Sequence, residues 1–154
     1  MTRDSPTATV TVRGDRTILL SNTPTVREKY GWDSRRFTIH CHTGRIVTGR
    51  WAGVPLGPVI EAAGFPDDTT HVLATGGDGH RACIEIGPTL DGLLGFVCAE
   101  IDRGHDDEFD DDWQDTPRLL APALDSARTV RDVVAITALS LTSGEDPETY
   151  EAII

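Results

Sequence analysis

The chain has 154 residues, 38% of them hydrophobic, and a formal net charge of -11 at pH 7. This length suits one domain with one core, and no apolar run is long enough to span a membrane. Lys and Arg number 14 against 25 Asp and Glu, so the chain lacks the overall positive charge of a nucleic-acid-binding domain.

The first half of the chain predicts strands and two short helices. We expect two strands within 8–20, a third over 36–41, and helices over 24–30 and 55–63. The helix over 24–30 has strong local signals, because Thr23 is a suitable N-cap, Pro24 suits the first position and Gly31 ends it. Gly64 ends the second helix in the same way.

The second half is richer in strand patterns. We expect strands over 71–75, 81–86, 95–101, 118–121 and 130–142, and a helical turn over 88–94. Gly76 to Gly79 form a tight turn between the first two. Strands and short helices mix without a regular β-α-β alternation, so the expected fold class is α+β and mostly β. We expect one domain over 1–154, with a core over about 8–142 and a polar C-terminal tail or short helix over 143–154.

Residues 106–115 hold seven acidic side chains in ten positions. Like charges at this density repel and cannot be buried, which predicts a solvated loop. A calcium-binding loop is the alternative, but the run lacks the central glycine and the terminal glutamate of a hand-type site.

Residue usage also bears on the protein's location. The start of the chain lacks the hydrophobic segment of a secretory signal, so we expect a cytoplasmic protein. The three cysteines cannot all pair and form no C-x-x-C motif. One lysine against thirteen arginines, with Asp outnumbering Glu, resembles proteins of salt-loving archaea. A GC-rich genome is the alternative explanation.

One thiol lies in a positively charged stretch. Cys41 ends the strand expected over 37–41, and no Asp or Glu occurs between Ser34 and Ile60. The nearby arginines are Arg35, Arg36, Arg45 and Arg50. Positive surroundings favour the thiolate, which binds soft metals or acts as a nucleophile, and arginines also hold phosphate. The alternative is a small buried cysteine.

Four pieces in order resemble the molybdenum-cofactor domain of the sulfite oxidase family. They are Cys41-x-x-Gly44-Arg45, the segment Arg50-Trp51-Ala52-Gly53-Val54-Pro55-Leu56, the turn Asp78-Gly79-His80-Arg81, and Pro117-Arg118-Leu119-Leu120-Ala121-Pro122 with Val130-Arg131 after it. The resemblance covers residues 41 to 131. It implies a compact, mixed and mostly β fold.

The resemblance also implies site residues. Cys41 would be the protein's thiolate ligand to molybdenum in a molybdenum–molybdopterin cofactor. His80 stands where the family often has Tyr, and it is a separate candidate for a proton donor. The phosphate of the pterin would be held by Arg45 and Arg118, with Arg128 and Arg131 as further candidates. The implied activity is oxygen-atom transfer on a small anionic substrate, either an oxyanion or a sulfoxide, with an unknown electron-transfer partner.

Each assignment has an alternative. Only forty residues precede Cys41, which favours a cofactor-free binding domain with the same fold and no redox activity. His80 could be an exposed turn residue, and Arg118 could form a salt bridge with the acidic run before it. A third class is a cysteine-nucleophile enzyme that pairs Cys41 with His80 or His42.

Overall fold

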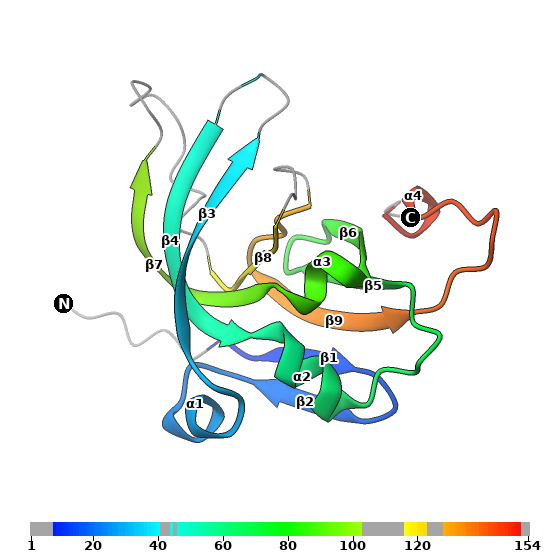
Figure 1. Cartoon of the computed structure of the whole chain (residues 1–154), viewed down its shortest axis with the longest axis horizontal. Helices are drawn as coiled ribbons and strands as arrows, with labels where there is room; N and C mark the ends of the chain where they lie inside the picture. The colour runs from blue at the N-terminus through cyan, green and yellow to red at the C-terminus, as the bar shows by residue number, and fades with distance from the viewer. Residues whose placement is uncertain (1–7, 41–43, 45, 103–115, 123–127, 152–154) are drawn as a thin grey trace.

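The computed structural model describes residues 8–40, 44, 46–102, 116–122 and 128–151 (Figure 1). Two sheets make up most of the fold. One has five strands in the order β2-β1-β9-β5-β6 and the other has four in the order β3-β4-β7-β8. The strands are β1 (Val10–Arg13), β2 (Thr17–Leu20), β3 (Asp33–His40), β4 (Ile46–Pro55), β5 (His71–Gly76), β6 (Arg81–Glu85), β7 (Leu93–Asp102), β8 (Arg118–Leu120) and β9 (Val133–Leu139).

In the described part of the chain, four short helices connect or flank the sheets. They are α1 (Pro24–Tyr30), α2 (Leu56–Ala63), α3 (Ile86–Leu90) and α4 (Glu148–Glu151). Helix α1 confirms its predicted bounds and caps, since Thr23 Oγ1 accepts the N–H of Val26 at 3.4 Å and Gly31 follows with φ 98°. Gly64 ends α2 in a left-handed conformation, as predicted.

All but one of the strand pairs among the described residues are antiparallel. The exception joins the two ends of the chain: β1 runs parallel to β9, with Thr11 opposite Ala135 and Arg13 opposite Thr137. Strand β1 is therefore internal to the five-stranded sheet although it lies near the N-terminus. The parallel pair accounts for the mixed character of the sheet.

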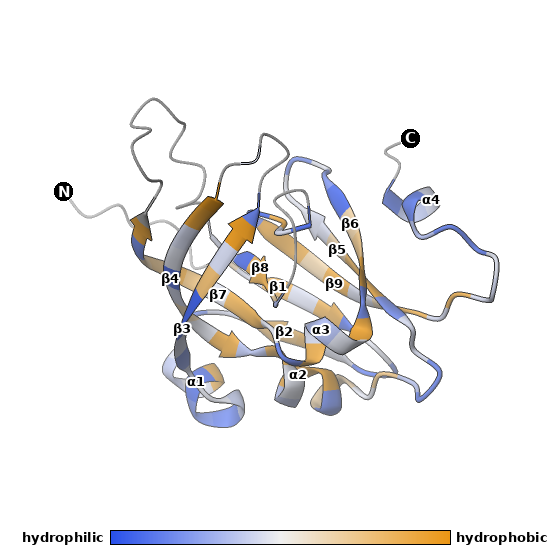
Figure 2. Ribbon diagram, turned by 45° about the horizontal axis from the view of Figure 1, so that its top comes forward, coloured by the Kyte–Doolittle hydropathy of each residue, from blue (hydrophilic) through white to orange (hydrophobic). Residues whose placement is uncertain are grey.

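The main core lies between the two sheets and includes α2. Hydrophobic and hydrophilic residues alternate along the strands, so each sheet turns one side to this core (Figure 2). A second cluster lies on the other face of the four-stranded sheet and contains Phe37, Ile39, Trp51, Leu93 and Leu120. The upper parts of β3 and β4 extend beyond the five-stranded sheet (Figure 1).

The structure departs from the predicted elements in four places. One is β9, which covers Val133–Leu139 where a strand over 130–142 was predicted. Strand β4 was not predicted, although it is ten residues long and pairs with both β3 and β7. The helical turn expected over 88–94 lies earlier, as α3, and β7 begins at Leu93. Strand β3 begins at Asp33, three residues before the predicted start. The acidic run 106–115 lies outside the described residues.

Candidate functional site

Arg118 is held inside the fold by the segment that follows β8. Its side chain is 3% exposed, and Nη1 donates to the carbonyl of Thr129 at 3.0 Å. Two backbone bonds fasten the same segment: the N–H of Leu119 donates to Val130 at 3.0 Å and that of Val133 to Pro117 at 2.9 Å. Arg118 is therefore fixed beside the stretch that carries Arg128 and Arg131.

The turn between β5 and β6 brings His80 and Arg131 to one carboxylate. Asp78 Oδ1 accepts the backbone N–H of His80 at 3.0 Å, and Oδ2 lies 4.0 Å from Nη2 of Arg131. The hydrogen bond from His80, with the positive charge of Arg131, lowers the pKa of Asp78. The N–H of Gly77 donates to the carbonyl of Asp132 at 2.8 Å, which joins this turn to the Arg131 segment.

Arg128 pairs with the C-terminal helix. Its Nη2 lies 3.9 Å from Oε1 of Glu151, and Oε2 of the same carboxylate accepts the backbone N–H of Cys83 at 2.8 Å. Strand β6 is at the edge of its sheet, so Glu151 satisfies a donor that no strand pairs with within the described part of the chain. Burial, together with the charge of Glu151, raises the pKa of the Cys83 thiol to about 11.

This environment predicts a slow thiol. Alkylation proceeds through the thiolate, so at about pH 8 we expect Cys83 to react at least tenfold more slowly than the half-buried Cys98, as an order-of-magnitude estimate. Glu151→Ala should raise the rate at Cys83 and leave Cys98 unchanged. Peptide mapping by mass spectrometry after timed exposure to iodoacetamide measures both. Equal rates at the two thiols in the unaltered protein would contradict the docking of α4.

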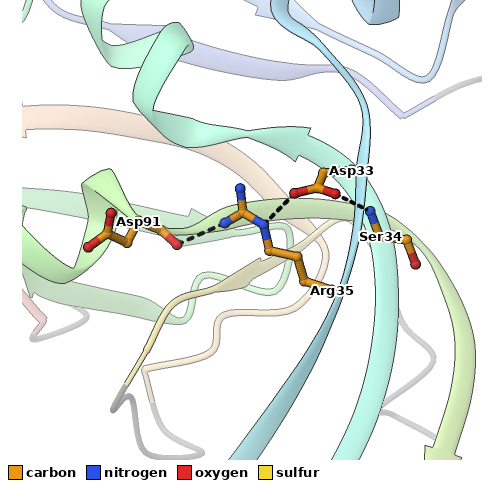
Figure 3. Close-up of polar contacts among 4 residues, drawn as sticks. All are labelled: Asp33, Ser34, Arg35 and Asp91. Atoms are coloured by element: carbon orange, nitrogen blue, oxygen red, sulfur yellow. Dashed lines mark hydrogen bonds and ion pairs between the residues drawn. The ribbon is translucent and has the colours of Figure 1, made fainter.

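The surroundings predicted for Cys41 are only partly described, because Cys41, His42 and Arg45 lie outside the described residues. The guanidinium of Arg35 binds other groups of the fold. Its Nε donates to Oδ2 of Asp33 at 2.6 Å and its Nη1 to the carbonyl of Asp91 at 3.0 Å (Figure 3). The hydrogen bond from Arg35 lowers the pKa of Asp33. Arg35 therefore links β3 to the turn before β7, and Asp33 balances its charge.

The sheet register separates the candidate residues into two groups. Arg118 lies opposite Gly95, which lies opposite Gly53, which lies opposite Asp33. His40, the last residue of β3, is seven residues beyond Asp33, and seven extended residues span about 23 Å along a strand. Arg118 is therefore not in the same row as the described end of the hairpin. Separately, Asp78 joins His80 to Arg131, and Thr129 joins Arg118 to the same segment.

The sequence reasoning missed three residues that contact the candidate arginines. Thr129 accepts a hydrogen bond from Arg118, Glu151 forms an ion pair with Arg128, and Asp78 forms one with Arg131. Asp78 had a local signal as the capping residue of its turn, and Thr129 stood between two candidate residues. Glu151 had none, because its contact depends on the C-terminal tail folding back on β6.

No three His, Cys, Asp or Glu side chains within the described ranges gather closely enough to hold a metal ion. No helix in this part of the chain is long and apolar enough to cross a bilayer.

Comparison with known proteins places the fold. No family model matches the chain, and no curated protein matches it by sequence. Among solved structures, the chain is similar to the sulfane dehydrogenase SoxCD from Paracoccus pantotrophus, with a TM-score of 0.66 and 14% identity. The match covers 87% of this chain and 38% of that one, so this chain spans well under half of the neighbour's length. The likeness confirms the expected α+β fold.

Proposed function

We propose that the chain is a molybdopterin-dependent oxidoreductase domain acting on a small oxyanion or sulfoxide. The proposal rests chiefly on the fold likeness to a sulfane dehydrogenase over 87% of the chain. It is supported by the position of Cys41, which directly follows the last residue of β3. In this proposal Cys41 holds the metal as a thiolate, and His80 supplies a proton to the substrate oxygen.

The described arginines have the chemistry that a pterin phosphate needs. Guanidinium groups donate to phosphate in a bidentate fork. Arg128 and Arg131 meet their carboxylates at 3.9 and 4.0 Å and are 35% and 43% exposed, so a phosphate could compete for both. Arg118 would position this segment through Thr129. When bound, the molybdenum–pterin group would supply two-electron oxygen-atom transfer.

The test is the metal content of cysteine variants made in a host that synthesises the cofactor. Purified protein should carry molybdenum, Cys41→Ser should lose almost all of it, and Cys98→Ser should keep it because Cys98 lies within β7. Elemental analysis of freshly purified samples gives the ratio of metal to chain. Unchanged molybdenum in Cys41→Ser would refute the ligand assignment.

A cofactor-free binding domain is the second candidate. It is favoured by two observations: each described arginine of the candidate set contacts a group of the protein itself, and the register sets Arg118 apart from the hairpin end. Less than about one molybdenum per ten chains in the unaltered protein would support this candidate over the oxidoreductase.

A further inference from the structure

Two arginines face each other across the β3–β4 hairpin. Arg36 lies directly opposite Arg50, and the next row pairs Thr38 with Thr48, whose hydroxyl oxygens are 3.3 Å apart. Directly opposed side chains lie on the same face of a sheet. Arg36 is exposed and Arg50 is half-buried, whereas Trp51, the neighbour of Arg50, is buried on the other face.

This arrangement is unfavourable for the isolated protein. Like charges directly opposite each other destabilise a strand pair. Acidic side chains outnumber basic ones by 25 to 14 in this chain, yet neither arginine side chain forms a hydrogen bond or ion pair with any described residue. Glu100 of β7 stands in register with Arg50 and so lies on the same face, but the two side chains do not reach ion-pair distance. Within the described structure, the charge of Glu100 therefore offsets part of the positive charge, and neither guanidinium is held in an ion pair.

The rest of the face is accessible and mostly polar. The exposed or half-buried residues on this side of the hairpin, here called the Arg36–Arg50 face, are Ser34, Arg36, Thr38, His40, Ile46, Thr48, Arg50 and Ala52. Strand β3 is also the first strand of its sheet, and among the described strands only β4 pairs with it. Its outer backbone groups are available to an added strand.

We propose that the Arg36–Arg50 face and the edge of β3 bind an extended acidic segment of a partner protein. Main-chain hydrogen bonds to β3 would supply the pairing, and alternate carboxylates of the segment would lie on the same face as the two arginines, next to Arg36 and one strand away from Arg50. The overall charge of -11 repels acidic partners elsewhere on the surface, so the charge pattern also selects the docking site. The inference does not depend on a bound cofactor.

The experiment uses a peptide of alternating Glu and Thr and follows backbone amide shifts by NMR. It is run at the lowest salt concentration at which circular dichroism shows the protein folded. We expect shifts over 34–40 and 46–50 that vanish as salt is added. The double variant Arg36→Gln/Arg50→Gln should bind about tenfold more weakly, while Arg13→Gln/Lys29→Gln, with the same change in net charge at exposed positions, should bind like the unaltered protein.

Four outcomes would overturn the proposal. One is the absence of shifts at millimolar peptide, and another is an equal loss of affinity in both double variants. A third is an equal response to sulfate alone, which would indicate a small-anion site. The fourth is tighter binding of a DNA strand of matched charge at the same amides, which would indicate a nucleic-acid surface. The spectrum of each variant also reports whether it is folded.

Discussion

Replacing Trp51 with alanine is expected to lower the free energy of unfolding by about 3–5 kcal/mol. The indole is fully buried at the centre of the second cluster and meets the ring of Phe37 edge-on, with 6.3 Å between ring centroids. It lies over two glycines: a Cβ added at Gly49 would come 2.6 Å from its Cη2, and one at Gly95 would come 3.3 Å from its Cδ1. In the Trp51→Ala variant, the space that the indole fills over these two glycines would be left empty.

Trp51→Phe separates packing from polarity. The indole Nε1 is buried and has no hydrogen-bond partner among the described residues, so its removal should recover part of the cost of the smaller ring. We therefore expect Trp51→Phe to lose less than half of the stability that Trp51→Ala loses. Urea denaturation followed by circular dichroism measures both, with the exposed Leu19→Ala as a control that changes stability little. A loss below about 1 kcal/mol for Trp51→Ala would show that the cluster is not packed as described.

Gly53→Ala should be at least as damaging, at about 3 kcal/mol or more, and should reduce the yield of folded protein. A Cβ at this position would overlap the backbone carbonyl of Leu94 and come 2.8 Å from Cα of Gly95. Both contacts are backbone atoms of β7, which cannot move without breaking the ladder. The register between β4 and β7 already shifts next to Gly53, between Ala52 and Gly53.

Gly87→Ala is the matched control. It makes the same change within α3, where an added Cβ meets nothing within 4 Å. Apart from its chain neighbour Pro88, nothing crowds the added methyl group, so we expect its stability to change by less than about 1 kcal/mol. If Gly53→Ala unfolded at the same denaturant concentration as Gly87→Ala, the close approach of β4 and β7 would be wrong.

The same glycines explain why β4 was missed from the sequence. Glycine weakens a strand pattern, and Gly49 and Gly53 interrupt this one twice. In the structure both glycines are required, because a side chain at Gly49 would collide with the indole of Trp51 and one at Gly53 with the carbonyl of Leu94. Both close approaches result from tertiary packing. Helix α1 was predicted correctly because its signals are local: Thr23, Pro24 and Gly31 act within one short segment.

The candidate site was likewise only partly predictable from the sequence. Its residues could be singled out by motif, but their partners could not, because the partners come from distant parts of the chain. Arg128 meets Glu151 and Arg35 meets Asp91, across 23 and 56 positions of sequence. A guanidinium that looks available in a motif is thus partly occupied in the fold, which changes what an incoming anion must displace.

The parallel pairing of β1 with β9 has a consequence for biosynthesis. The β1–β2 hairpin leaves the ribosome well before β9, so one edge of β1 stays open until residues 133–139 have been made. Until then Val10 and Val12, fully covered in the finished fold, have no complete sheet to face. Folding of this sheet must therefore wait for β9, and nascent chains stalled before it would be prone to aggregate or to recruit chaperones.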